Sequence, residues 1–215
     1  MSGIAPGKSF VQITDSNGEA FAQLFAIYEE SMPTSERKTR AAIAALVDRN
    51  DYHVVGMKVL DEVVAFFILF LSARHAVGLL EYMATKNSSR SRGLGSDLFK
   101  KAAELAGALP MLIEVDSERE RLPDQHLRAR RKTFYLRHGC RQMPNLDYLM
   151  PTIGVAEPPT MDLLCYWKDR TDTPSSDVIR EWLERIYVEV YGCARDDHRI
   201  DLMVQGFMNG AEAQT

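Results

Sequence analysis

The chain has 215 residues, of which 46% are hydrophobic and 26% charged, so it is long enough for one globular domain with a sizeable core. Its formal net charge of −4 excludes the strongly basic balance typical of proteins that bind nucleic acids or anionic membranes. The cysteines Cys140, Cys165 and Cys193 form no C-x-x-C pair, which predicts reduced thiols in a cytoplasmic protein.

No segment has the pattern expected for export or membrane insertion. The N-terminal residues before Phe10 contain no apolar run, so we expect no secretory signal. The longest apolar run, Val63–Leu71, is far shorter than the ~20 residues that span a bilayer and is predicted to be a buried strand. The histidines are scattered without metal-ligand spacing, so we expect no metal site.

Two helices are predicted near the N-terminus. Ser16 and Glu19 have the spacing of a capping box and are followed by apolar residues at helical intervals. The dipeptide Met32-Pro33 ends this helix, because the residue before a proline disfavours helical geometry. A second helix is predicted to begin near Thr34 or Ser35.

The remaining pattern predicts strands and two further helices. The later helices begin near Gly95 and Arg128, so the expected order is β-α-α-β-β-β-α-β-α-β-β. This order excludes a Rossmann domain, in which the glycine motif follows the first strand. The predicted strands are Phe10–Ile13, Tyr52–Leu60, Val63–Leu71, Val77–Thr85, Met111–Asp116, Pro144–Ile153 and Met161–Trp167.

The junction between the fourth strand and the third helix has the composition of an anion cradle. Gly93 and Gly95 have no Cβ, so a ligand can approach the backbone closely. The first N–H groups of a helix have no intrahelical partner and carry partial positive charge. Arg90 and Arg92 add full charges suited to phosphate oxygens. The segment is therefore predicted to bind a pyrophosphate.

Two motifs together resemble one enzyme family. Arg90-x-x-Gly93-x-Gly95, between a strand and a helix, resembles the acyl-coenzyme A motif of GCN5-related N-acetyltransferases. The later helix that carries Tyr135 four residues before Gly139 is similar to that family's second motif. The resemblance covers roughly residues 9–168. It implies an α/β fold with a mixed, mostly antiparallel sheet flanked by helices.

The resemblance also implies where the acyl donor binds. The fourth strand would pair its backbone with the pantetheine arm through Tyr82, Met83 and Ala84, and one N–H group there would polarise the thioester oxygen. The residues expected to hold the diphosphate are Arg90, Ser91, Arg92, Gly93, Leu94, Gly95 and Ser96.

Four side chains are candidates for proton transfer, and one of them is Asp116, a candidate base on the same strand face as Glu114. Tyr135 is the expected acid for the leaving thiolate, because a phenol is protonated at neutral pH. Glu81, in a buried strand, is the first candidate for the base that deprotonates the amine, and Glu114 in the next strand is the second. A structural ion pair or packing role remains an alternative for each of them.

Other residues near these motifs have weaker assignments. Glu29, Glu30 and Glu36 flank the turn that covers the acceptor side in the family, so they are candidates to recognise a cationic amine or are simply solvated. Arg128 departs from the family, which often has an asparagine there. The basic run that follows it either reaches the adenosine phosphates or forms a solvated helix face.

These observations predict an acetyl-coenzyme A-dependent N-acetyltransferase that uses direct attack by a primary amine in a ternary complex. Small amines, antibiotics, peptide N-termini and protein lysines all remain open as acceptors. The alternatives are a non-catalytic coenzyme A-binding or regulatory module with the same fold, and an enzyme acting on charged transfer RNA, which the acidic balance disfavours. We expect the acyltransferase domain in residues 1–170. A helical extension in residues 171–215 has enough apolar surface to pack on the domain or on a second subunit as a homodimer.

Overall fold

The computed structural model describes residues 7–34, 37–72, 76–90, 92–119, 123–152, 158–170 and 172–212. The chain divides into two compact units. The first comprises Met1–Leu71 and Leu80–Leu105, and the second comprises Ser72–Leu79 and Ala106–Thr215. Each unit is described below by itself.

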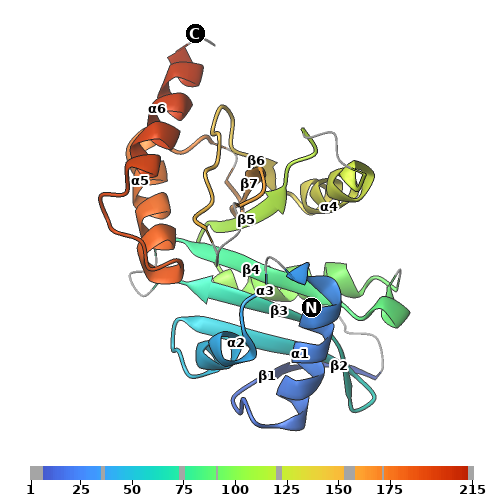
Figure 1. The fold of residues 1–215 in the computed structure, drawn as a ribbon. Coiled ribbons are helices and arrows are strands. Elements are labelled where there is room, and N and C mark those ends of the chain that lie inside the picture. Colours follow the sequence, from blue (N-terminus) through green and yellow to red (C-terminus); the bar gives the residue numbers. More distant parts are fainter. Residues whose placement is uncertain are drawn as a thin grey trace. The chain divides into compact units, whose positions relative to one another are not determined.

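The order of helices and strands is the one expected from the sequence, followed by the C-terminal helices (Figure 1). The elements are β1 (Lys8–Gln12), α1 (Glu19–Ser31), α2 (Arg40–Val47), β2 (Tyr52–Val59), β3 (Glu62–Leu71), β4 (Gly78–Thr85), the 3-10 turn η2 (Asn87–Ser89), α3 (Leu94–Ala106), β5 (Met111–Asp116), α4 (Gln125–Arg137), β6 (Arg141–Gln142), β7 (Met161–Tyr166), α5 (Ser176–Arg185), the π-helical turn η3 (Ile186–Val190) and α6 (His198–Glu212).

The strands form one mixed sheet in the order β1-β2-β3-β4-β5-β7-β6. The pairs β1-β2, β2-β3, β5-β7 and β6-β7 are antiparallel, and β4-β5 is parallel. This confirms the expected fold class, a mixed and mostly antiparallel sheet flanked by helices.

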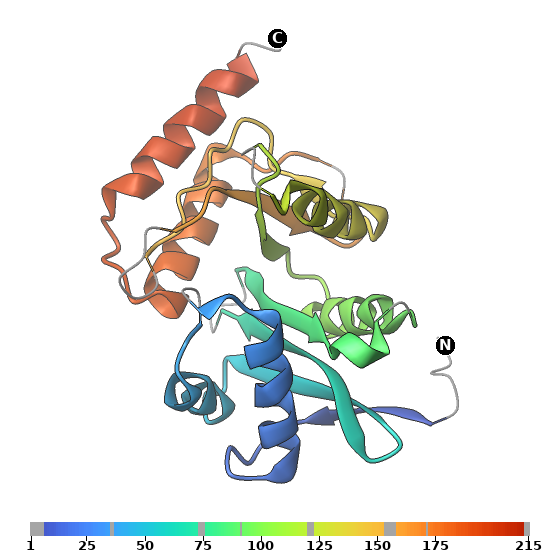
Figure 2. The same ribbon diagram turned by 45° about the vertical axis from the view of Figure 1, so that its right-hand side comes forward.

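In the first unit, helices cover both faces of the strands (Figures 1 and 2). Phe66 of β3 points toward α1, where its ring lies 6.4 Å from that of Tyr28. Phe10 of β1 pairs with Met57, and the ammonium of Lys101 in α3 lies 6.0 Å from the Phe10 ring. Since Met57 is adjacent to Gly56, the partner of Phe66, Phe10 and Phe66 point to opposite faces. Helix α1 therefore covers one face and α3 the other.

In the second unit, β5 and β7 also present two different faces. Glu114 and Val115 are consecutive in β5, and Asp162 pairs with Val115. Glu114 and Asp162 therefore point to opposite faces. Asp162 contacts α4 through Lys132, whereas Glu114 contacts the C-terminal helices, in which α5 and α6 lie side by side (Figure 2). The boundary expected at residue 170 stays a prediction.

The start of the second helix differs from the prediction. Helix α2 begins at Arg40, after an N-cap at Thr39 whose hydroxyl accepts a hydrogen bond from the Ala42 N–H at 3.2 Å. The N-cap Thr39 is extended, and just before it the Lys38 N–H donates to the Tyr28 hydroxyl of α1 at 2.8 Å. The capping box predicted from Ser16 and Glu19 is also wrong. Helix α1 has Gly18 as its N-cap and no side-chain cap.

The strand predicted at Pro144–Ile153 is wrong over its described part. The two-residue strand β6 ends before Pro144. It is followed by a turn in which Asn145 has φ 55°. Residues 146–152 are irregular, although Leu146 and Tyr148 are buried at alternate positions, which is why the pattern resembles a strand. Ile153 lies outside the described residues.

A buried ion cluster joins α4 to β7 in the second unit. Asp162 is 1% exposed, and one of its oxygens accepts a hydrogen bond from the Lys132 ammonium at 2.8 Å. The other accepts one from Arg119 at 3.1 Å, and Lys132 also contacts Glu118 at 2.9 Å. A buried pair of this kind contributes little net stability, but removing one partner leaves an uncompensated charge in a low-dielectric environment.

We expect Asp162→Ala to lower the free energy of unfolding by about 3–5 kcal/mol, because Lys132 would remain buried without its closest partner. Asp172→Ala is the control, since the Asp172–Arg170 pair lies at the surface and should contribute at most about 1 kcal/mol. The measurement is urea unfolding of both variants at pH 7. Equal losses in the two variants would show that burial does not govern the effect.

Candidate active site

The loop between β4 and α3 is tied to α1. Its 3-10 turn η2 begins at Asn87, whose side-chain amide donates a hydrogen bond to the Glu30 carboxylate. The Asn87 N–H contacts the same carboxylate at 3.4 Å. Glu30, a candidate for amine recognition, therefore holds this loop instead of standing free.

Gly93 lies at the point where the loop enters α3. Its carbonyl oxygen accepts hydrogen bonds from the N–H groups of Ser96 and Asp97, at 3.1 and 3.3 Å. Its φ of +75° is a conformation that favours glycine. A Cβ added at Gly93 would meet no atom within 4 Å, so the space above this backbone is open.

The other predicted cradle residues surround Gly93 in the first unit. Arg90 and Arg92 are exposed, Gly95 and Ser96 are half-buried in the first turn of α3, and Leu94 is buried. Ser91 lies outside the described residues. Open backbone beside a helix N-terminus, with two exposed arginines nearby, fits the diphosphate of a nucleotide-type donor such as coenzyme A.

Strand β4 leaves its neighbour after two residues. Its parallel ladder with β5 joins Gly78 to Met111 and Leu79 to Leu112, and among the described residues the register ends there. The later part of β4 holds Tyr82, Met83 and Ala84, the residues predicted to pair with a pantetheine arm. Tyr82 is buried with its ring edge-on to Tyr28 at 5.0 Å, and the other two are half-buried.

Glu81 is engaged in a cluster within the first unit. Its side chain is 4% exposed and forms an ion pair with Lys38. The Tyr52 hydroxyl donates a hydrogen bond to its second oxygen at 3.1 Å. Burial, and then the Glu81 charge, raise the pKa of Tyr52 well above its usual value, so this hydroxyl remains a donor throughout the physiological range.

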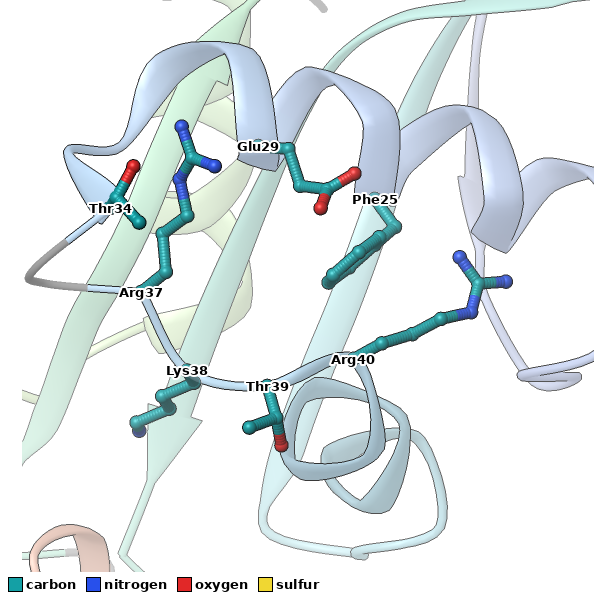
Figure 3. Close-up of a pocket in the computed structure, with 7 residues that line it drawn as sticks. All are labelled: Phe25, Glu29, Thr34, Arg37, Lys38, Thr39 and Arg40. Carbon is teal, nitrogen blue, oxygen red and sulfur yellow. The ribbon is translucent and has the colours of Figure 1, made fainter. Parts of the chain in front are cut away.

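A pocket of about 550 Å³ opens beside this cluster, between α1 and the segment before α2 (Figure 3). Glu29 and Phe25 extend into it from α1. The Arg37 side chain donates to the Met32 carbonyl at 2.6 Å, and the Arg40 guanidinium lies 5.0 Å from the Phe25 ring. The lining residues are Phe25, Glu29, Thr34, Arg37, Lys38, Thr39 and Arg40. Glu36 lies outside the described residues.

Glu114 of β5 is held by two tyrosines in the second unit. The Tyr148 hydroxyl donates a hydrogen bond to one carboxylate oxygen. The Tyr191 hydroxyl donates to the other at 2.6 Å. Burial, and then the charge of Glu114, hold the pKa of Tyr148 well above its usual value. Glu114 thus accepts hydrogen bonds from two tyrosines, whereas Glu81 forms an ion pair with Lys38.

Tyr135 lies in the last turn of α4, in the second unit. The N–H of Cys140 donates to the Tyr135 carbonyl and the N–H of Gly139 donates to the Leu136 carbonyl, both at 3.1 Å. With Gly139 at φ +88°, these bonds form a Schellman motif that ends the helix. The Tyr135 side chain is 7% exposed, and burial raises the pKa of its hydroxyl above the usual value.

The basic run of α4 is largely used within the second unit. Arg128 contacts Asp124 at 3.0 Å, Arg131 pairs with Asp116, and Lys132 belongs to the buried ion cluster. These contacts favour the structural alternative for three of the four residues.

The structure therefore brings the predicted residues together in two groups. Glu81, the strand from Tyr82 to Ala84 and the glycine loop lie in the first unit, and Tyr135 and Glu114 lie in the second. Sequence reasoning did not find the partners of the two glutamates. These are Lys38, Tyr52, Tyr148 and Tyr191, which lie 29 to 77 positions away from them in the chain.

No group of three or more His, Cys, Asp or Glu side chains among the described residues is placed to hold a metal ion. No helix in the described part of the chain is long and apolar enough to cross a membrane.

No protein-family model and no curated protein matches the sequence of this chain. Solved structures match its fold. A protein from Bacteroides thetaiotaomicron assigned to the GNAT family of acetyltransferases has a TM-score of 0.70 and 21% identity, and the match covers 86% of this chain and 99% of that chain.

Two matched structures have more specific descriptions. The ribosomal-protein-S18-alanine N-acetyltransferase from Escherichia coli has a TM-score of 0.54 and 14% identity over 77% of this chain and 96% of that chain. Naa50 from Arabidopsis thaliana, in complex with the bisubstrate analogue CoA-Ac-MVNAL, has a TM-score of 0.56 and 14% identity over 74% and 98%. These likenesses confirm the expected fold, that of the GCN5-related N-acetyltransferases.

Proposed function

Since the chain has the fold of GCN5-related N-acetyltransferases, we propose that it transfers an acetyl group from acetyl-coenzyme A to a primary amine by direct attack in a ternary complex. The observation that carries this proposal is the open backbone at Gly93, between β4 and α3 and next to two exposed arginines. When bound, the donor supplies the activated acyl group and a thiolate leaving group.

The first unit holds the donor in this proposal. The N–H groups at the start of α3 and the guanidinium groups of Arg90 and Arg92 bind the diphosphate, and Gly95 and Ser96 lie in the same helical turn. The register of β4 with β5 among the described residues covers Gly78 and Leu79, and the backbone of Tyr82–Ala84, later in β4, is proposed to hold the pantetheine arm and to donate to the thioester oxygen.

The side chains proposed for proton transfer are Tyr135 and a glutamate. As the C–N bond forms and the C–S bond breaks, Tyr135 gives its hydroxyl proton to the departing sulfur. Before attack, the substrate ammonium loses a proton to a carboxylate. We propose Glu114 for this step, because the Tyr148 and Tyr191 hydroxyls orient its two oxygens, whereas Glu81 forms an ion pair with Lys38.

The ion pair at Glu81 also fits a second candidate function. A non-catalytic coenzyme A-binding module would keep the fold and the loop, and would use Glu81 and Tyr135 for packing alone. The two functions differ in turnover. Only the transferase releases free thiol when acetyl-coenzyme A is mixed with a suitable amine.

We expect acetyl-coenzyme A to bind and to raise the melting temperature, because a ligand that binds only the native state adds about 2.7 kcal/mol at a hundredfold excess over Kd. Calorimetric titration and thermal unfolding measure both effects, with adenosine as a control that lacks the diphosphate. Absence of binding at millimolar donor would contradict both candidate functions. Binding without thiol release across a panel of small amines and peptides would favour the non-catalytic module.

A further inference from the structure

The C-terminal helices reach β5 through an irregular turn. After α5, the π-helical turn η3 is closed by a hydrogen bond from the Tyr191 N–H to the Ile186 carbonyl at 3.3 Å, five residues apart. Such turns occur mostly as single insertions in helices and often at functional sites. Here the turn places Tyr187 and Tyr191 on one side of the helix, with ring centroids 6.4 Å apart.

The two tyrosines contact different parts of the second unit. The Tyr187 hydroxyl donates a hydrogen bond to the carbonyl of Leu149, in the irregular segment after β6. The Leu149 N–H in turn contacts the sulfur of Met203 in α6 at 3.3 Å. The C-terminal helices therefore hold the segment that carries Tyr148. The Tyr191 hydroxyl contacts Glu114 itself, at 2.6 Å.

Glu114 thus receives one donor from each of two segments that follow β6 in the chain. Tyr148 is 5% exposed and occupies one oxygen, whereas the half-buried Tyr191 occupies the other. On β7 the residue paired with Glu114 is Leu163, which carries no charge. Tyr187 and Cys193 act electrostatically on Tyr148, and Arg199, Asp197, Cys193 and Glu114 act on Tyr187.

We propose that Tyr191 is a positioning residue for Glu114, so that the C-terminal extension completes the proton-accepting site on β5. Tyr191 fixes the orientation of the carboxylate, and the extension fixes Tyr148 through Leu149. This inference rests on the proposed function only where Glu114 serves as the base. The hydrogen bonds to Glu114 do not depend on turnover.

Tyr191→Phe tests the proposal, because it keeps the ring and removes the hydroxyl that donates to Glu114. A hydrogen bond to the charged form lowers the pKa of a carboxyl group, so its loss should raise the pKa of Glu114 by about one unit. Two measurements on the full-length protein follow from this. One is the pKa of the Glu114 side chain by nuclear magnetic resonance, and the other is the acid limb of kcat/KM against pH.

Tyr187→Phe is the matched control, since it removes a hydroxyl from the same side of the turn but one that donates to Leu149. Because Leu149 is adjacent to Tyr148, whereas Tyr191 donates to Glu114 directly, this variant should lower stability and move the acid limb less than Tyr191→Phe does. Tyr148→Phe removes the second donor to Glu114 and should move the limb in the same direction as Tyr191→Phe. It keeps the test decisive should Tyr191→Phe fold poorly.

The outcomes separate the positioning of Glu114 by Tyr191 from the role of Glu114 as the base. An upward shift of both the Glu114 pKa and the acid limb supports the proposal. An unchanged Glu114 pKa in Tyr191→Phe and Tyr148→Phe overturns it, whatever the activity. If the pKa shifts but the limb does not, Glu114 is not the base and the proposal is overturned as a statement about the reaction. Absence of turnover in the wild type with a shifted Glu114 pKa contradicts the proposed function and leaves the positioning of Glu114 supported.

Discussion

Tyr135→Phe is expected to lower kcat at least tenfold, within the ~10²–10⁴-fold that general acid catalysis contributes. The ring remains, so packing at the end of α4 should change little. Donor affinity should also change little, because the proton is needed mainly in the transition state. Steady-state kinetics with acetyl-coenzyme A and an accepted amine give both quantities.

The dependence of activity on pH gives a second expected result for Tyr135→Phe. Burial raises the pKa of Tyr135, so the hydroxyl stays protonated beyond the usual phenol pKa of ~10. Loss of activity caused by its ionisation should therefore appear only above about pH 10, and this loss should be absent in Tyr135→Phe. Unchanged kcat and an unchanged alkaline limb would remove Tyr135 from the reaction. A large fall in melting temperature would instead assign the hydroxyl a structural role.

Gly93→Glu is expected to abolish detectable binding of acetyl-coenzyme A. The new side chain would put negative charge and bulk into the open space where the diphosphate is proposed to bind. Calorimetric titration measures the loss, and circular dichroism checks that the fold is retained.

Gly107→Glu is a closely matched control for this experiment. Gly107 also has a positive φ, +63°, and a Cβ there also meets no atom within 4 Å. Both substitutions therefore carry a similar backbone strain of roughly 1–2 kcal/mol, but Gly107 lies beyond the C-terminal end of α3. Binding lost in both variants would trace the effect to strain. Binding retained in both would show that the diphosphate site lies elsewhere.

The sequence predicted the strands best where an apolar run is bounded by turn residues. Met111–Asp116 is β5 with the same bounds, and β4 differs from its prediction by one residue. Prediction failed where tertiary contacts decide the conformation. Helix α2 starts only after the N-cap Thr39, next to Lys38, whose N–H bonds to the Tyr28 hydroxyl of a different helix. The segment around Tyr148 alternates in burial because it packs on the C-terminal helices, without a partner strand in the described residues.

The candidate site was predictable only where it is contiguous in the chain. The glycine loop and the tyrosine helix could be recognised because their residues are close in sequence. The partners of Glu81 and Glu114 could not, because nothing local marks Lys38 or Tyr191 as their neighbours. The spacing of Tyr135 and Gly139 also has a local cause, since Gly139 ends α4 in a Schellman motif. The spacing of Tyr135 and Gly139 is therefore explained by the end of the helix and is not by itself evidence that Tyr135 takes part in the reaction.

The π-helical turn Ile186–Val190 constrains the length of the C-terminal extension as well as its composition. Each residue of an α-helix advances the side-chain direction by about 100°. In a regular α-helix of the same length, Tyr191 would lie about that angle further round the axis and away from Glu114, although no functional side chain had been altered. The helical phase set by a single inserted residue thus determines which side chain faces β5.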